Sequence, residues 1–190
     1  RNFEYYSEDG VLSSSLTVAV IKGAKKKGVY TYLKHFALND QETNRDTSGL
    51  VVWANEQAMR ENYFLPFEKA VKDGGTNAMM SAFNRIGFTW CGGNYTLLTT
   101  LLRDEWGFDG AVISDWGGSN DRVESIKAGG DLEMPSCKYG VDEIVKAVKE
   151  GKLEESAVDK CVERVLTLIE RTTKGESTGK FDVEAHHALA

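Results

Sequence analysis

The sequence predicts an α/β protein that forms part of an eight-stranded β/α barrel, with about four parallel strands and outer helices. Short apolar runs alternate with segments of helical periodicity from residue 12 onward, which is the pattern of strand–helix units around a parallel sheet. Four strands are about half of such a barrel, so two apolar strand edges would have no neighbour. We therefore expect a TIM-type barrel that is truncated at both ends.

The buried strands are predicted from four apolar runs. These runs are residues 28–36 (GVYTYLKHF), 77–83 (NAMMSAF), 110–114 (GAVIS) and 130–134 (GDLEM). The segments between them place apolar residues three and four positions apart, as expected for helices that cover the outside of the sheet.

Two helical segments are expected before the third strand. Residues 53–73 contain Pro66, which cannot lie inside a helix without removing a backbone hydrogen bond. We therefore expect two helices there, the second beginning near Pro66. Residues 95–102 carry leucines at helical spacing before a break at Gly107.

Two further helices are expected after the last strand. Residues 141–149 should form a helix with Gly151 at its C-cap. Residues 156–171 carry the clearest apolar stripe, and Ser156 with Asp159 resembles a capping box at its start.

The end of the chain differs from the rest. Residues 172–190 lose the helical periodicity and gain glycine, serine and threonine. We expect them to be a linker that leads from a barrel domain, residues 1–171, to a missing second α/β domain. Because the chain begins at Arg1 rather than at methionine, we also expect both ends to be cuts through a longer polypeptide.

The composition excludes several classes of protein. The net charge is −6 and the charges are spread along the chain, so a basic footprint for nucleic acid is absent. No apolar stretch approaches the roughly 20 residues of a membrane span. Cys91, Cys137 and Cys161 are odd in number and lack metal-ligand spacing. This favours reduced thiols, no metal site and a cytoplasmic location.

Polar residues follow the predicted strands, where a β/α barrel carries its catalytic groups. Across the four strands these residues are Lys34, His35, Asn84, Arg85, Asp115, Trp116 and Glu133. A helix cap or a structural ion pair would explain any one of them. Their presence at the end of all four strands favours an active-site face.

Asp115 is the candidate nucleophile. A retaining glycosidase needs an ionised carboxylate near the anomeric carbon and a protonated one about 5 to 5.5 Å away. Cations such as Lys34 and Arg45 would favour the charged form of Asp115. Trp116 offers an apolar face to a sugar ring, and Lys34 with His35 could donate hydrogen bonds to hydroxyls. The alternatives are that Asp115 caps the next helix and that Trp116 is a buried packing residue.

Five blocks of the sequence resemble glycoside hydrolase family 3, and within it the bacterial β-glucosidases. In the family's order they are RNFEYYSED (1–9), KHFALNDQETNR (34–45), MSAFN (80–84), LLRDEWGFDGAVISDW (101–116) and DLEMP (131–135). The ending DVEAHHALA looks like the start of the connection into the family's second domain.

The resemblance implies an O-glycosyl hydrolase that releases terminal nonreducing β-D-glucosyl residues by double displacement. Asp115 matches the catalytic nucleophile, and Trp116 matches a residue that lines the aglycone side. The residues implied to bind the sugar are Arg1, Lys34, His35, Arg45 and Met80. No metal or organic cofactor is implied.

The sequence also departs from the family pattern. Phe83 stands where many members have a tyrosine whose hydroxyl could bond the nucleophile. The general acid/base of the family's β-glucosidases is a glutamate of the domain after the barrel, outside this chain. An upstream aspartate that grips the sugar is absent too. We therefore expect the isolated chain to be inactive or weakly active without the missing strands and the second domain.

Other functions stay open at this point. A β-xylosidase or a dual-specificity enzyme would share most of these blocks, and the chain could be a noncatalytic carbohydrate-binding piece. An N-acetylglucosaminidase is disfavoured because the Lys-His pair of that branch is usually followed by Pro-Gly-His. A phosphate-binding barrel is disfavoured because no glycine-rich loop precedes a helix after the final strands.

Overall fold

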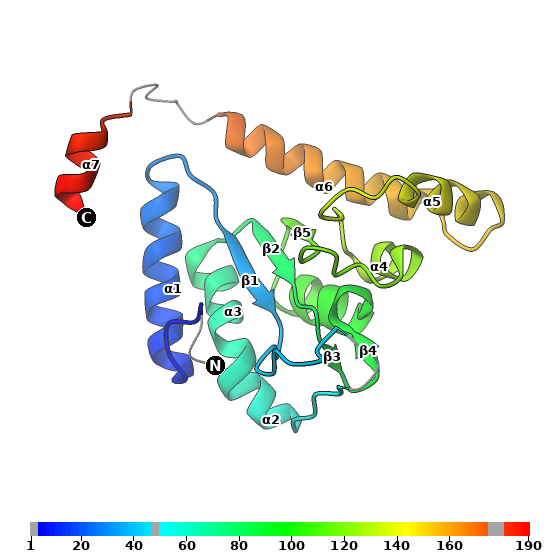
Figure 1. Ribbon diagram of the computed structural model, residues 1–190, viewed down its shortest axis with the longest axis horizontal. Helices are drawn as coiled ribbons and strands as arrows, with labels where there is room; N and C mark the ends of the chain where they lie inside the picture. Colours follow the sequence, from blue (N-terminus) through cyan, green and yellow to red (C-terminus); the bar gives the residue numbers. More distant parts are fainter. Residues whose placement is uncertain (1–3, 47–49, 175–180) are drawn as a thin grey trace.

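Three parallel strands form the sheet in the computed structural model, which describes residues 4–46, 50–174 and 181–190 (Figure 1). The strand order is β1 (Tyr32–Phe36), β2 (Ala78–Ser81) and β5 (Ala111–Ile113). Tyr32 pairs with Ala78 and Ala78 pairs with Ala111, so the strands begin at the same level. The predicted parallel arrangement of an α/β barrel fragment is confirmed.

The fourth predicted run, residues 130–134, forms a single parallel bridge between Leu132 and Ile113 rather than a strand. The run lies beside β5 as expected, but Asp131 interrupts the ladder. Its carboxylate accepts the backbone N–H of Val112 at 2.7 Å, in place of a backbone carbonyl. The same carboxylate is fully buried between Arg103 and Arg164, at 2.8 and 3.0 Å. Backbone pairing at this edge is limited to a few hydrogen bonds, such as the Ser114 N–H to the Leu132 carbonyl at 2.9 Å, and the buried ion pairs of Asp131 add to them.

The segment around Pro66 follows one helical path instead of two separate helices. It consists of α2 (Glu56–Ala58), the π-helix η1 (Met59–Phe64), α3 (Leu65–Lys69) and the π-helix η2 (Ala70–Gly74). Pro66 lies in the first turn of α3, where its missing N–H is tolerated. The wider turns of η1 precede it, so the hydrogen-bond pattern changes at the proline without a break in the chain direction.

Helices cover the sheet and continue past it. They are α1 (Gly10–Lys25), the π-helix η4 (Thr96–Glu105), α4 (Arg122–Ala128), α5 (Gly140–Lys149) and α6 (Glu155–Thr173). The helix ends match expectation at Gly151, which follows the cap of α5 with φ +68°. The predicted Ser156–Asp159 capping box is not formed, because α6 already begins at Glu155 after the cap residue Glu154.

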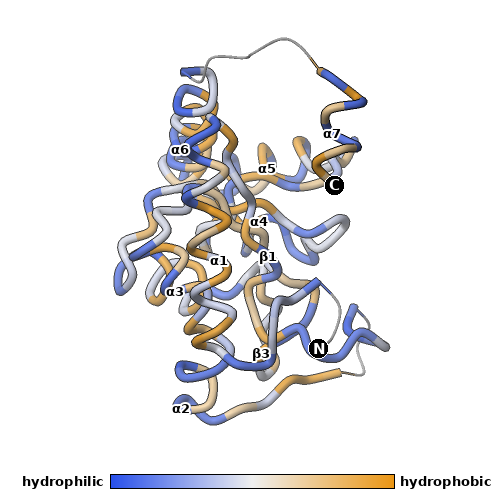
Figure 2. The backbone as a smooth tube through the Cα atoms, turned by 90° about the vertical axis from the view of Figure 1, so that its left-hand side faces the viewer, coloured by the Kyte–Doolittle hydropathy of each residue, from blue (hydrophilic) through white to orange (hydrophobic). Residues whose placement is uncertain are grey.

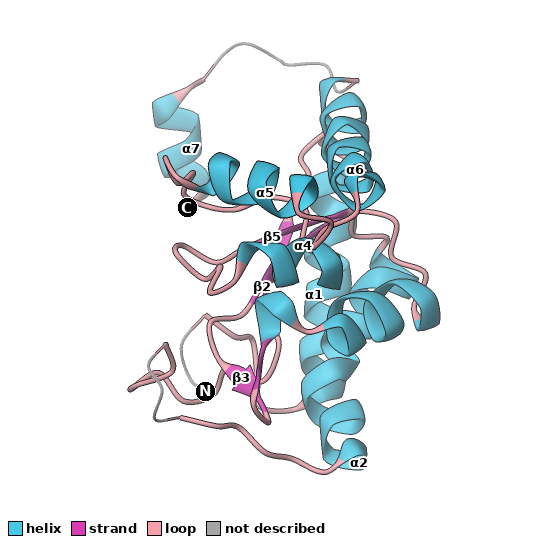
Figure 3. Cartoon of the chain, turned by 90° about the vertical axis from the view of Figure 1, so that its right-hand side faces the viewer, coloured by secondary structure: helices cyan, strands magenta, loops and turns pink. Residues whose placement is uncertain are grey.

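Several short elements were not predicted. A hairpin of β3 (Arg85–Ile86) and β4 (Thr89–Trp90) follows β2, and it lies at the opposite end of the molecule from α6 (Figure 3). Within the expected linker, α7 (Val183–Leu189) is a helix whose cap Asp182 accepts a hydrogen bond from the Ala185 N–H at 3.0 Å. The short 3-10 turn η3 (Cys91–Gly93) completes the elements.

The core between the sheet and the helices is aromatic at its centre. Phe36 of β1 is fully buried, and its ring centroid lies 5.1 Å from that of Phe67 and 5.7 Å from that of Trp106. Leu98 and Leu102 of η4 are fully buried in the same cluster. This packing fixes the carboxyl end of β1, which carries the candidate site.

Two of the outer helices, α1 and α6, carry exposed apolar side chains. On α1 the exposed side chains at helical spacing are Leu12, Leu16 and Val20, and Figure 2, in which α1 faces the viewer, shows the hydrophobic residues of this helix. On α6 the exposed apolar side chains are Val162, Leu166 and Ile169. Contiguous exposed apolar surface of this kind marks a contact face in soluble proteins.

Candidate active site

His35 and Asp115 meet at the carboxyl-terminal end of the sheet. His35 belongs to β1, and Asp115 lies two residues after β5. The imidazole Nε2 of His35 is 3.2 Å from Oδ2 of Asp115, and the two residues are 5% and 9% exposed. The end of β1 and the loop after β5 therefore bring an imidazole nitrogen and a carboxylate oxygen into direct contact.

The loop after β5 holds Asp115 in place from its main chain. Oδ1 accepts the backbone N–H of Trp116 at 2.7 Å, and the Asp115 carbonyl accepts the N–H of Gly118 at 2.8 Å. Gly117, the third residue of this turn, has φ +80°, a conformation that favours glycine. The Ser114 hydroxyl accepts the N–H of Met134 at 2.8 Å, which ties the turn to the fourth run. The carboxylate is therefore fixed by the fold.

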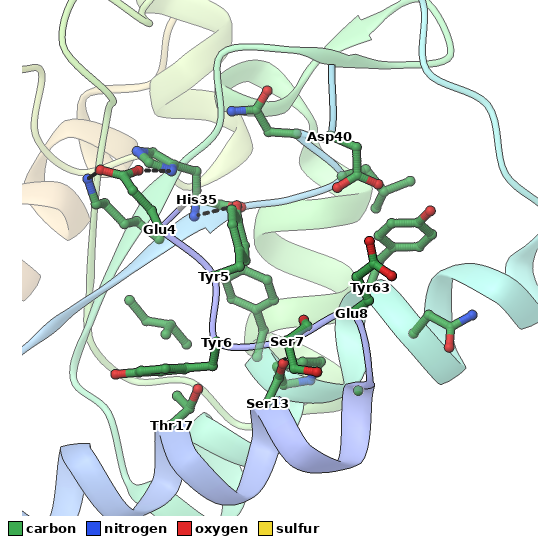
Figure 4. Close-up of a pocket in the computed structure, with 18 of the residues that line it drawn as sticks. Glu4, Tyr5, Tyr6, Ser7, Glu8, Ser13, Thr17, His35, Asp40 and Tyr63 are labelled. Carbon is green, nitrogen blue, oxygen red and sulfur yellow. Dashed lines mark hydrogen bonds and ion pairs between the residues drawn. The ribbon is translucent and has the colours of Figure 1, made fainter. Parts of the chain in front are cut away.

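Glu4 joins the site and was missed by the sequence reading. Its Oε1 lies 3.1 Å from Nζ of Lys34, and its Oε2 lies 3.9 Å from Nδ1 of His35 (Figure 4). Next to it, the Tyr5 hydroxyl accepts the backbone N–H of His35 at 3.1 Å. Both residues lie in the RNFEYYSED block, of which only Arg1 was predicted to bind the sugar. Arg1 itself lies outside the described residues.

A cavity of about 570 Å³ opens beside this group. Residues 4–8, the first turns of α1, strand β1 and the region around Tyr63 line it, and Figure 4 shows Tyr5, Tyr6 and Tyr63 around it. Lys34 and His35 belong to its lining. The charge of Asp40 and, less strongly, burial raise the pKa of Tyr63, so this phenol stays protonated at neutral pH.

The other predicted site residues that the structure describes have partners other than Asp115. The Arg45 guanidinium lies over the Phe83 ring at 4.6 Å and pairs with Glu42 at 2.8 Å. Met80 is half-buried on β2 and pairs in register with Ile113 of β5. Trp116 is 66% exposed, so it is no packing residue of this chain.

Three strand-end residues have structural partners instead. Asn84 is fully buried and donates to the carbonyl groups of Ala37 and Leu38 at 3.1 and 3.2 Å. The Arg85 guanidinium lies 3.5 Å from the centroid of the Trp90 ring. Glu133 forms a double ion pair with Arg122, 2.8 Å on each side. Of the four predicted strand ends, two therefore meet at one site, through His35 after β1 and Asp115 after β5.

Asp115 is not a helix cap. The helix that follows it, α4, is capped by Asp121, whose carboxylate accepts the N–H of Glu124 at 2.9 Å. Two of the cysteines are poor nucleophiles, because burial raises the pKa of Cys91 to about 12 and that of Cys161 to about 11. Across residues 4–46, 50–174 and 181–190, no group of three metal-binding side chains converges. No helix of those ranges is long and apolar enough to cross a membrane.

Residues 1–168 match the family model for the glycosyl hydrolase family 3 N-terminal domain. The chain belongs to glycoside hydrolase family 3. The expected resemblance to this family is confirmed. The family's proteins are larger, since this chain spans about a quarter of the length of its relatives.

Several of the relatives and solved structures that this chain is similar to are named beta-glucosidase. Thermostable beta-glucosidase B of Acetivibrio thermocellus is 46% identical over 192 residues, which covers 100% of this chain and 25% of the relative. An exo-alpha-(1->6)-L-arabinopyranosidase of Bifidobacterium longum is 42% identical over the same share. Beta-glucosidase 3B from Thermotoga neapolitana in complex with glucose has a TM-score of 0.90 and 41% identity, covering 100% of this chain and 28% of that one.

Proposed function

We propose that this chain supplies the nucleophile and much of the sugar-binding surface of a retaining β-glucosidase, with Asp115 as the nucleophile. The observation that carries the proposal is the 3.2 Å contact between Asp115 and His35, next to Lys34 at the same strand end. A buried carboxylate beside an imidazole, at the face where β/α barrels carry catalytic groups, suits an attack on an anomeric carbon.

The reaction proceeds in two displacements. Asp115 attacks the anomeric carbon, the bond to the leaving oxygen breaks, and a glutamate outside these residues donates a proton to that oxygen. A glycosyl ester on Asp115 results. The same glutamate then takes a proton from water, which attacks the anomeric carbon and restores the carboxylate. Two inversions leave the product with retained configuration.

The neighbouring residues bind the substrate. Lys34 and His35 donate hydrogen bonds to vicinal hydroxyls of the nonreducing glucose. The exposed Trp116 ring stacks on the aglycone. Arg45, Met80 and Arg1 complete the sugar-binding surface in this proposal, which rests for these three residues on the family motifs.

The site becomes complete only with further polypeptide. The uncovered faces of α1 and α6 and the free edge of β1 support the presence of additional strand–helix units on both sides. We propose that these units and a second α/β domain, which carries the acid/base glutamate, belong to the same enzyme. Residues 172–190 then form the linker to that domain. The unpaired cysteines are consistent with a cytoplasmic enzyme.

The nucleophile is tested by trapping. A 2-deoxy-2-fluoro-β-glucoside with a good leaving group forms the glycosyl ester quickly and hydrolyses slowly, because fluorine destabilises the cationic transition state. Peptide mass spectrometry of the treated full-length enzyme should find the added sugar on Asp115. A label on another carboxylate would contradict the proposal. Rates on aryl β-glucosides, β-xylosides and α-L-arabinopyranosides then define which glycone is preferred.

A further inference from the structure

We propose that Glu4 is a positioning residue of this site, whose carboxylate holds the side chains of Lys34 and His35 in the orientation that binds substrate hydroxyls. The inference rests on the proposed function, because it concerns how two residues of that site are oriented. Glu4 itself acts on the substrate only through Lys34 and His35.

The two oxygens of Glu4 are directed to different partners. Oε1 accepts a hydrogen bond from the Lys34 ammonium at 3.1 Å, and Oε2 lies 3.9 Å from Nδ1 of His35. The other imidazole nitrogen, Nε2, is 3.2 Å from Asp115. The imidazole is therefore located between two carboxylates, one on each ring nitrogen. At 3.9 Å the Glu4 carboxylate is beyond hydrogen-bond distance of Nδ1, so it acts on the imidazole through its charge, while its direct hydrogen bond goes to Lys34.

Lys34 needs such a partner more than His35 does. Its side chain is 41% exposed and has four rotatable bonds, so without a partner it would sample many rotamers in water. The ion pair with Glu4 selects one of them. A site that binds hydroxyl groups gains affinity when its donors are already ordered, because less conformational entropy is lost on binding.

The main chain brings Glu4 to this position from the start of α1. Asp9 caps α1 by accepting the N–H groups of Val11 and Leu12, each at 2.8 Å, and the Ser13 hydroxyl donates to the Ser7 carbonyl at 2.9 Å. The segment that precedes the helix is thereby anchored across the end of β1 (Figure 4).

Glu4 itself has an uncommon backbone. Its φ is +65°, a conformation that costs energy for a residue with a side chain such as glutamate. The hydroxyl of the next residue, Tyr5, accepts the backbone N–H of His35. Glu4 therefore faces the side chain of His35, and Tyr5 binds its backbone. Such a turn is what places the Glu4 carboxylate over Lys34 and His35.

The alternative is that Glu4 only stabilises the fold through its ion pair with Lys34. A partly exposed ion pair usually contributes little to stability. The two roles differ in what they change. A structural residue affects how many molecules are folded, whereas a positioning residue changes the affinity of every folded site. The Michaelis constant and the affinity for free glucose therefore separate them.

The experiment compares E4Q, E4D and E68Q in the full-length enzyme that contains this chain, with an aryl β-glucoside as substrate and glucose as competing ligand. We expect E4Q to raise KM and the glucose inhibition constant by about 10- to 100-fold, the range for loss of a charged hydrogen bond. The kcat should change by less than about threefold, because hydroxyl contacts act in the ground state and the transition state alike. E4D, which keeps the charge, should recover part of the loss.

E68Q is the matched control, because Glu68 also pairs with a single lysine, Lys72 at 2.6 Å, and does not line the cavity. An E4Q enzyme whose KM and glucose constant stay within about twofold of wild type, whatever its melting temperature, overturns the positioning role. D115A is measured in parallel. An inactive D115A beside a normal E4Q rejects the inference on Glu4 alone, whereas an active D115A rejects the proposed function.

Discussion

His35 and Asp115 touch although the strands that carry them are not neighbours in the sheet. β2 lies between β1 and β5, and adjacent strands are spaced by about 4.8 Å. The two side chains therefore lean towards each other over the end of β2. The contact requires all three strands to keep their register. A shift of one strand along its neighbour would separate the two side chains.

The nucleophile assignment predicts a large loss of activity for D115A. Removal of the attacking carboxylate should lower the hydrolysis of an aryl β-glucoside by about 1,000-fold or more. Asp109 gives a matched control, because it precedes β5 as Asp115 follows it and pairs with Arg171 at 2.7 Å on the surface. D109N should keep nearly the full rate. Comparable losses in both variants would point to damage of β5 rather than to catalysis.

Trp116 should act on the aglycone rather than on the chemistry. W116A removes an exposed ring, so KM for a disaccharide should rise by about tenfold while the rate with an activated aryl leaving group changes less. W53A, which removes another exposed tryptophan, serves as control. Equal effects of W116A on every aglycone in steady-state kinetics would contradict this role.

The buried pair at the edge of the sheet should be important for stability. Asp131 has no exposed surface and binds both Arg103 and Arg164, and burial lowers the pKa of Arg103 while Asp131 opposes the shift. D131N leaves a buried guanidinium without its counter-charge and should cost about 3 to 5 kcal/mol in the free energy of unfolding. D109N should cost at most about 1 kcal/mol in the same denaturant titrations. A small effect of D131N would show that water reaches Arg103.

Thiol chemistry should separate the three cysteines. Burial raises the pKa of Cys91 to about 12 and that of Cys161 to about 11, so both stay protonated at pH 8 and their thiolate fraction grows only as the pH rises towards those values. Cys137 is half-buried. We expect iodoacetamide at pH 8 to label Cys137 first, with the other two modified after unfolding. Mass spectrometry of the time course detects the order, and early labelling of Cys91 would contradict its burial.

Local sequence pattern located the three strands of the sheet. The strands at Tyr32–Phe36, Ala78–Ser81 and Ala111–Ile113 lie within predicted runs, since each is a short apolar stretch whose pairing needs no further information. The fourth run failed because its pattern does not reveal that Asp131 is held by two arginines from distant helices. Whether an acidic residue ends a strand or pairs inside the core depends on those partners.

Glu4 shows where the same reasoning could not reach. It precedes the first helix in a segment without periodicity, and its partners lie on β1, so only the tertiary path of residues 4–9 brings them together. Asn84 is the opposite case. It stands at a strand end like a catalytic residue but holds two backbone carbonyls of the loop after β1. The position of a residue at a strand end therefore predicts where its side chain lies, but not which group it will bind.

The uncovered faces of α1 and α6 have a practical consequence for anyone who produces these 190 residues alone. The apolar face of α1 on one copy can pack on the apolar face of α6 on a second copy. Such a head-to-tail contact leaves one α1 face and one α6 face free at the two ends, so further copies can add and the assembly grows without closing. Light scattering should therefore rise steadily with protein concentration instead of levelling off at a dimer. Lysine in place of Leu16 and Leu166 should return the sample to single chains.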